Sequence, residues 1–202
     1  PEKSFRVASI IGKFDLPSET IIEHFAGIID IPEKWQIGLI TGASGTGKTS
    51  IAKELFPEAY LTDFNYCSDA VINDMPEASV EAITKAFNSV GFSSPPSWLK
   101  PYNVLSNGQK MRVDLAYAML SDKEMFVFDE FTSVVDRQVA KIGSFAMQKA
   151  IRKGNKKFIA LTCHSDVEEW LLPDWVFDTN SMTFRDCGEQ KKNRPAVKFE
   201  IF

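Results

Sequence analysis

The feature that most constrains this chain is a glycine-rich loop at residues 42–49, which reads Gly-Ala-Ser-Gly-Thr-Gly-Lys-Thr. The loop fits the pattern G-x-x-x-x-G-K-[ST], which in proteins follows a strand and opens a helix. An apolar run at 35–41 precedes it and a helix-compatible run at 50–56 follows it. The pattern therefore predicts a strand at 36–41, a phosphate-binding turn, and a helix at 48–56.

Each residue type in this loop has a physical reason for its place. The three glycines let the backbone curl so that its N–H groups point inward, and the start of the next helix adds a positive end. Lys48 is expected to reach the β- and γ-phosphates of a nucleoside triphosphate, and the Thr49 hydroxyl to ligate Mg²⁺. The expected contact residues are Gly42, Ala43, Ser44, Gly45, Thr46, Gly47, Lys48, Thr49 and Ser50.

Two further segments end in polar residues that fit the same chemistry. The apolar run at 125–128 predicts a buried strand, and Asp129 and Glu130 follow it directly. Open α/β sheets bind ligands at this end of their strands, so we expect Asp129 to hold Mg²⁺ and Glu130 to polarise the attacking water. A second strand, at 158–162, is expected to bring His164 to the same edge. Cys163 beside it is interpreted as a packing residue.

The remaining segments predict a mixed α/β chain. Ser106 and Gln109 form an S-x-x-Q capping box, which marks the start of a helix at about 107–120. Earlier in the chain, 4–14 predicts one or two strands, and Phe14 there fits either stacking on an adenine or a core or edge-strand position. Further helices are expected at about 78–90 and 136–152, a hairpin at 177–185, and a basic tail or contact surface at 191–198.

Composition limits the class of protein. The 202 residues carry a net charge of −4, which provides no global basic field for nucleic acid or anionic lipid. No apolar run approaches 18 residues and the start lacks a signal-peptide pattern, so we expect a cytoplasmic protein without a membrane span. Three cysteines without a C-x-x-C pair indicate neither a disulfide framework nor a zinc site.

Taken together, these segments resemble an ABC-type ATPase nucleotide-binding domain. The loop at 42–49 resembles Walker A, and 125–130 resembles Walker B with its catalytic glutamate. Leu105–Gln109, LSNGQ, resembles the LSGGQ signature, with Asn107 in place of a glycine. Ser133–Asp136 stands at the D-loop position, and His164 at the position of the switch histidine. Within the family, the chain looks most like the compact stand-alone ABC ATPases of phages and bacteria.

The resemblance implies a fold. It is an α/β P-loop NTPase fold of ABC type, with N-terminal antiparallel β strands and a reduced helical subdomain at about 63–120, all within a single domain at 1–202. The helical part is short because only 58 residues separate Lys48 from Ser106. No glutamine lies between Gln36 and Gln109, so the family's Q-loop glutamine is missing. Asp69, Asn73 or Asp74 are candidates to replace it, and we favour Asp74 as a further Mg²⁺ ligand.

The resemblance also implies a function. ATP and Mg²⁺ are expected to bind at the loop and to join two copies head to tail, with Ser106, Gly108 and Gln109 of one copy meeting the γ-phosphate held by the other. Asp136 is expected to link the two sites. We expect a homodimer with ATP that acts as a switch on nucleic acid or a protein partner. The alternatives are the ATPase subunit of a membrane transporter and a non-hydrolysing ATP-sensing module.

Overall fold

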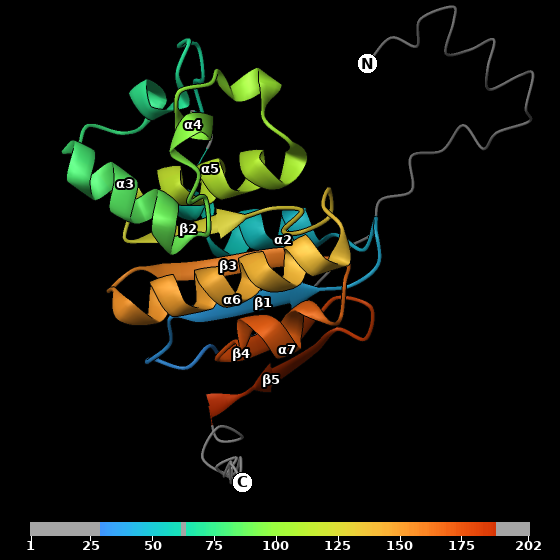
Figure 1. Ribbon diagram of the computed structural model, residues 1–202. Coiled ribbons are helices and arrows are strands. Elements are labelled where there is room, and N and C mark those ends of the chain that lie inside the picture. The colour runs from blue at the N-terminus through green and yellow to red at the C-terminus, as the bar shows by residue number, and fades with distance from the viewer. Residues whose placement is uncertain (1–28, 62–63, 189–202) are drawn as a thin grey trace, which may run out of the picture.

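A computed structural model describes residues 29–61 and 64–188 of the chain (Figure 1). The expected N-terminal strands, Phe14 and the basic segment at 191–198 lie outside these residues. The described elements are, in order, β1 (Ile37–Thr41), α2 (Lys48–Leu55), η1 (Pro57–Ala59), η2 (Val71–Asp74), α3 (Val80–Ser89), α4 (Pro95–Trp98), η3 (Tyr102–Val104), α5 (Asn107–Leu120), β2 (Met125–Phe128), α6 (Arg137–Lys153), β3 (Lys157–Thr162), α7 (Val167–Leu171), β4 (Trp175–Asp178) and β5 (Thr183–Asp186).

These strands form one sheet in the order β2-β3-β1-β4-β5. The first four strands in this order run parallel, and only β5 is antiparallel, paired with β4 in the expected hairpin. Thr41 at the end of β1 pairs with Thr162 at the end of β3. The ends of β1, β2 and β3 therefore meet at one edge of the sheet, as the sequence predicts.

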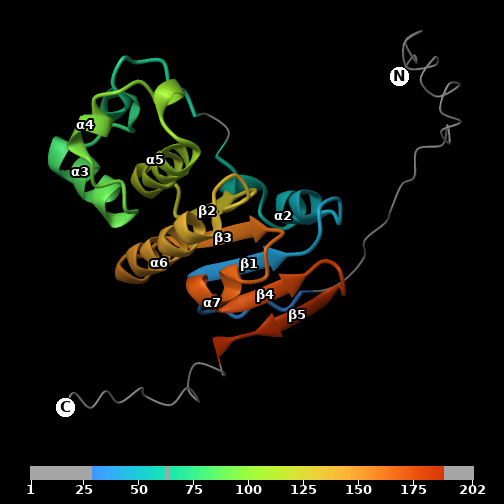
Figure 2. The ribbon, with the colours of Figure 1, turned by 45° about the vertical axis from the view of Figure 1, so that its right-hand side comes forward.

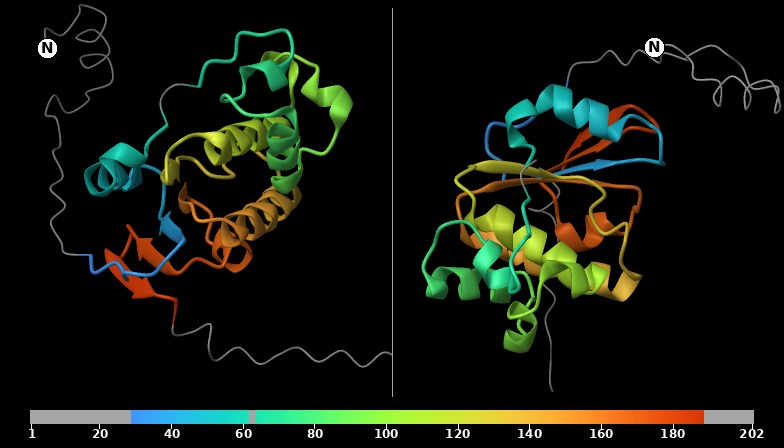
Figure 3. Two further views of the ribbon diagram at one scale, coloured as in Figure 1. Left: turned by 90° about the vertical axis from the view of Figure 1, so that its left-hand side faces the viewer. Right: turned by 90° about the horizontal axis from the view of Figure 1, so that it is seen from above.

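The helices cover both faces of the sheet. Helix α2 lies on one face, and α6 and α7 lie on the other (Figures 2 and 3). Helices α3, α4 and α5 form a separate group beyond the β2 edge, which corresponds to the predicted helical subdomain (Figure 2). The fold is thus the expected α/β arrangement with a small helical part.

The core follows from alternation along the central strand β1. Ile37 and Leu39 point to the face covered by α6, and Ile40 points to the face covered by α2, where Phe56 and Trp175 pack. Gly38 is required here, because a Cβ at this position would lie 2.1 Å from the Trp175 ring. The strand is buried on both faces, which explains its nearly continuous apolar sequence.

Local capping places the two long helices. Helix α5 begins with the predicted capping box, in which the Ser106 hydroxyl accepts from the Gln109 N–H and the Gln109 side chain accepts from the Ser106 N–H. The Asp136 carboxylate accepts from the N–H groups of Gln138 and Val139 at 3.0 Å, so α6 starts one residue later than expected. Both caps satisfy N–H groups that a helix start leaves without partners.

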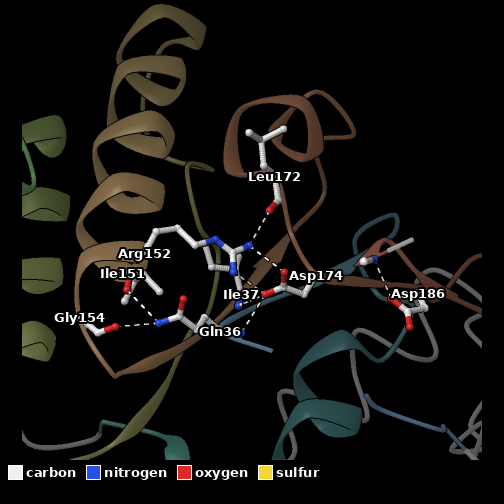
Figure 4. Close-up of polar contacts among 9 residues, drawn as sticks. Gln36, Ile37, Ile151, Arg152, Gly154, Leu172, Asp174 and Asp186 are labelled. Carbon is white, nitrogen blue, oxygen red and sulfur yellow. Dashed lines mark hydrogen bonds and ion pairs between the residues drawn. The ribbon is translucent and has the colours of Figure 1, made fainter. Parts of the chain in front are cut away.

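A polar network fixes the opposite edge of the sheet, where the parallel strands begin (Figure 4). The Asp174 carboxylate accepts from the N–H groups of Gln36 and Ile37 and from the guanidinium of Arg152. Arg152 also donates to the Leu172 carbonyl at 3.0 Å. This network ties the starts of β1 and β4 to the end of α6, far along the strands from the phosphate-binding loop.

Within the described ranges, none of the helices has both the length and the apolar character needed to cross a bilayer.

Candidate functional site

The phosphate-binding loop connects β1 to α2 and depends on its glycines. Gly45 and Gly47 have φ angles of 84° and 82°, in the left-handed region that glycine favours. Gly47 is the N-cap of α2 and gives that helix no side-chain cap. The first N–H groups of α2 therefore face the loop without a capping side chain, which is the arrangement that binds anions at helix starts.

Lys48 lies across the mouth of this loop. Its Nζ donates to the carbonyl oxygens of Gly42 at 2.9 Å and Ala43 at 2.7 Å. The ammonium is thus held beside the backbone that curls around the expected phosphates. A flexible four-carbon stem lets it exchange these carbonyls for stronger, charged acceptors.

Thr49 and Asp129 come together from two different elements. The Thr49 hydroxyl donates to one Asp129 oxygen at 2.7 Å, and the other Asp129 oxygen accepts from the Glu130 N–H at 2.9 Å. A hydroxyl and a carboxylate side by side are the oxygen donors that suit Mg²⁺, which takes few protein ligands and completes its shell with water and phosphate. Across the described residues, no three His, Cys, Asp or Glu side chains gather to hold a metal by themselves. A metal here would therefore depend on phosphate oxygens as well.

Glu130 stands on a strained turn after β2. Its φ is 55° and that of Thr132 is 68°, which is unusual for any residue with a side chain and more so for a β-branched one. Phe131 between them is fully buried, and its N–H donates to the Leu161 carbonyl at 2.7 Å. Thr132 is 1% exposed, and its hydroxyl has no hydrogen-bond partner in the described structure. Strain of this kind gathers at functional turns.

A cavity of about 340 Å³ joins these pieces. Its walls come from the loop, from the end of β2 and from the end of β3, and they comprise Ser44, Gly45, Gly47, Lys48, Thr49, Ser50, Asp129, Glu130, Ser133, Thr162 and Cys163. The structure therefore brings together Lys48, the Thr49–Asp129 pair and Glu130, as expected.

The end of β3 differs from the sequence interpretation. Cys163 is exposed and lines the cavity, so its interpretation as a packing residue is wrong. His164 is half-buried, its backbone N–H donates to the Thr162 hydroxyl at 3.2 Å, and it is not among the lining residues. The side chain that reaches the cavity after a strand depends on backbone direction at the turn, which periodicity does not reveal. The role of His164 stays a prediction.

The signature and D-loop residues lie elsewhere. Ser106, Gly108 and Gln109 form the start of α5, and the Gln109 amide also donates to the Ser97 hydroxyl at 3.2 Å. Asp136 caps α6. None of these four residues lines the cavity around Lys48 in the same chain.

Asp74 also lies apart from the cavity lining. One of its oxygens accepts from the N–H groups of Cys67 and Ser68 at 3.2 and 3.0 Å, and the other is buried without a hydrogen-bond partner in the described structure. These contacts fix a turn in the helical part of the chain. They supply no support for Asp74 as a metal ligand, and that role stays a prediction.

Two contacts at the site have no clear sequence signal. The Tyr60 hydroxyl donates to the Thr49 carbonyl at 3.3 Å, and burial, together with the nearby Asp129 charge, raises the pKa of Tyr60 to about 12. Asn180, in the turn after β4, accepts from the Ala43 N–H at 2.9 Å. Neither contact can be read from a local pattern, because the two residues of each pair are brought together by the fold, 11 positions apart for Tyr60 and Thr49 and 137 for Asn180 and Ala43.

The chain is similar to known proteins in sequence over part of its length, and in fold. No known family profile matches the chain. The chain is 32% identical over 102 residues to the ABC multidrug transporter atrD of Emericella nidulans, covering 50% of this chain and 7% of the transporter. It is 26% identical over 126 residues to a Brucella abortus protein whose name describes it as ATP-binding, covering 61% of this chain and 36% of that protein. The chain thus spans well under half the length of these relatives.

Solved structures agree on the fold. The dimeric bacterial ABC transporter cassette MJ0796 matches with a TM-score of 0.58 and 15% identity, over 74% of this chain and 83% of that chain. A bacterial Atm1-family ABC exporter matches with a TM-score of 0.54 and 16% identity, over 71% of this chain and 32% of the exporter. The resemblance seen in the sequence is therefore confirmed at the level of the fold: the chain has the fold of ABC cassettes.

Proposed function

We propose that the chain binds ATP with Mg²⁺ in the cavity between α2 and the ends of β2 and β3, and that it hydrolyses the γ-phosphate in an ATP-dependent homodimer. The observation that carries this proposal is the convergence of Lys48, the Thr49–Asp129 pair and Glu130 on one cavity. The relatives add support, because one MJ0796 structure is described as a post-hydrolysis dimer bound to ADP and Pi.

Each group has a task in this proposal. Lys48 and the N–H groups at the start of α2 bind the phosphates, and Thr49 and Asp129 hold Mg²⁺, which neutralises phosphate charge when bound. Glu130 orients the attacking water and accepts its proton as the water oxygen bonds to the γ-phosphorus and the bond from that phosphorus to the β,γ-bridging oxygen breaks, which releases ADP and phosphate. His164 approaches the γ-phosphate once the dimer has formed.

The second copy completes the site. Ser106 and Gly108 lie at the start of α5, where small residues and a positive helix end suit an anion supplied by another chain. Two segments are expected to meet the partner, the start of α5 and the turn that ends at Asp136. An exposed apolar side chain lies beside each of them: Val104 is 63% exposed and Val134 is 61% exposed. Exposed apolar residues next to expected contact segments favour an interface there. A two-fold dimer would place each start of α5 over the other copy's loop.

The test compares Glu130→Gln with the wild type and with Glu124→Gln, a change to an exposed acid that does not line the cavity. We expect Glu130→Gln to bind ATP, to release phosphate at least about a hundredfold more slowly, and to accumulate as a dimer. Light scattering with saturating ATP measures the dimer, and a phosphate assay measures turnover. If Glu130→Gln stays monomeric with ATP while Glu124→Gln and the wild type turn over equally, the dimer mechanism is wrong.

The work driven by hydrolysis is proposed to be a switch on nucleic acid or a protein partner. The support is the short spacing of 58 residues between Lys48 and Ser106 and the missing glutamine, both of which reduce the part that serves transporter docking in the family. An ATPase rate that rises with added DNA or RNA, and loses that rise with salt, would support a nucleic-acid partner.

A second candidate is the ATPase part of a transporter. The names of the relatives favour it, since atrD and MJ0796 are both described as transporter proteins. Copurification with a membrane protein and an ATPase rate that responds only to that protein would select this candidate over the switch.

A further inference from the structure

The turn that joins β4 to β5 touches the phosphate-binding loop directly. The Asn180 side-chain oxygen accepts from the Ala43 N–H at 2.9 Å, and these residues are 137 positions apart in the chain. The neighbouring Thr179 hydroxyl lies 2.5 Å from the Thr46 hydroxyl and 3.1 Å from the Thr41 carbonyl. Two adjacent side chains of the turn thus contact three residues in and beside the loop.

Thr179 also shapes the first glycine of the loop. Gly42 has a φ of 150°, and a Cβ there would lie 2.1 Å from the Thr179 hydroxyl oxygen. The Thr179 backbone N–H donates to the Thr41 carbonyl at 2.8 Å, which extends the pairing of β1 with β4. Thr179 is 4% exposed, so its buried side chain packs directly against the first residue of the loop.

The turn is itself held in place. The Asn180 N–H donates to the Asp178 carboxylate at 2.8 Å, which fixes the residue that contacts Ala43. A loop with three glycines is otherwise flexible, and ordering it on binding would cost affinity. A rigid turn pressed against it removes part of that cost in advance.

We propose that Thr179 and Asn180 are positioning residues that hold the loop in its phosphate-binding shape and so set the affinity for the nucleotide. The inference rests on the proposed function, in which the loop binds the phosphates of ATP. Asn180 occupies the Ala43 N–H, which leaves the N–H groups nearer the start of α2 for the phosphates. The turn therefore acts on the ligand through the loop backbone.

The first test replaces Asn180 with Ala in the full chain. Asn180 is exposed, so the change removes a hydrogen bond without opening the core. We expect Mg²⁺·ATP to bind roughly three- to tenfold more weakly, the worth of one hydrogen bond, with KM raised and kcat little changed. Ser181→Ala is the matched control, because Ser181 lies in the same turn and its hydroxyl contacts that of Thr183, 2.7 Å away, which lies outside the phosphate-binding loop.

The second test replaces Asn180 with Asp and varies salt. A carboxylate can still accept from the Ala43 N–H, but it places a negative charge beside an anion site. We expect weak ATP binding at low salt and recovery toward the wild-type affinity at about 0.5 M salt, where charges are screened within several ångströms. The Asn180→Ala defect should persist at both salt concentrations.

Several outcomes overturn the inference. Wild-type affinity in Asn180→Ala does so, and so does an equal loss in Ser181→Ala, which would indicate a general effect of the turn. Asn180→Asp remaining as weak as Asn180→Ala at high salt also does so. If the wild type itself binds no Mg²⁺·ATP, the proposed function fails first, and that result is distinct from each of these.

Discussion

The Thr49 hydroxyl donates a 2.7 Å hydrogen bond to the Asp129 carboxylate, across 80 positions of the chain. Thr49 belongs to the first turn of α2, and Asp129 directly follows β2. Strand β2 does not neighbour β1 but is separated from it by β3. The sheet order therefore places the hydroxyl and the carboxylate side by side at one edge, where together they offer the oxygen ligands that suit Mg²⁺.

This pair predicts a graded response to substitution. Thr49→Ser keeps the hydroxyl and should retain turnover, whereas Thr49→Val keeps the shape without it and should lower kcat by about a hundredfold. The reason is that the Asp129 carboxylate loses its donor and Mg²⁺ loses a ligand. Phosphate release at saturating Mg²⁺ and ATP measures the effect. Equal rates for the Ser and Val variants would contradict a role for the hydroxyl.

Thr132 predicts a reversal of the usual order of glycine and alanine. At most positions a glycine variant is less stable than an alanine variant, because glycine loses more backbone entropy on folding. With a φ of 68° at this position, Thr132→Ala keeps the strain and Thr132→Gly releases it. We expect the Gly variant to have a free energy of unfolding about 1 kcal/mol above that of the Ala variant.

Denaturant unfolding of the two variants checks this difference, since both lose the same buried hydroxyl and differ only by one methyl group. We also expect the Gly variant to turn over more slowly than the Ala variant, because a looser turn positions Glu130 less well. An Ala variant as stable as the Gly variant would show that the left-handed turn carries no strain.

The parts of the site that the sequence predicted share one property. Lys48, Asp129 and Glu130 each belong to a local motif with a defined place at a strand or helix end, and the parallel sheet then brings those ends together. The capping box of Ser106 and Gln109 is equally local. Such features need only a few neighbouring residues to be recognised.

The parts that the sequence did not predict depend on long-range packing. The contact of Asn180 with Ala43 requires β4 to lie beside β1, which the hairpin pattern alone does not specify. Tyr60 forms an isolated parallel β-bridge with Val127 and donates a hydrogen bond to the Thr49 carbonyl. A single bridged residue leaves no periodic pattern in the sequence. The exposure of Cys163 in the cavity depends on the direction of one turn. Short helices such as α4 and α7 also lack the length that a periodic pattern needs.

Asp114 predicts a pH-dependent stability in the helical part. The hydroxyls of Tyr66 and Tyr102 donate to its two oxygens at 2.8 and 2.9 Å, and the two rings stack with centroids 3.9 Å apart. Burial raises the pKa of Asp114 from 3.8 to about 6, against the lowering effect of the two hydroxyls and of Lys110. The folded state therefore binds this proton more tightly than the unfolded state does.

The higher pKa in the folded state determines how stability depends on pH. The contribution of Asp114 to stability is fully present below about pH 4 and is lost as the pH rises through about 6. Asp114→Asn cannot titrate, so the wild type should lose stability relative to this variant over that range. Unfolding at several pH values measures the difference. In Tyr66→Phe the carboxylate loses a donor that lowers its pKa, so its titration, followed by NMR, should move to higher pH.

Asp174 predicts a loss of stability that leaves the chemistry intact. Its side chain is 14% exposed and accepts from two backbone N–H groups and from Arg152, whose guanidinium also serves the Leu172 carbonyl (Figure 4). Asp174→Ala leaves a half-buried charge and two N–H groups without this acceptor, so we expect the free energy of unfolding to fall by about 3 kcal/mol.

Because this network lies at the edge of the sheet opposite the phosphate-binding loop, the folded fraction of Asp174→Ala should keep the wild-type kcat and KM for ATP. Denaturant unfolding and steady-state kinetics below the melting temperature measure the two effects separately. Asp186→Ala serves as the control, since the Asp186 carboxylate is exposed and accepts from the nearby Gly188 N–H. A lowered kcat in folded Asp174→Ala would show that the two edges of the sheet are coupled through β1.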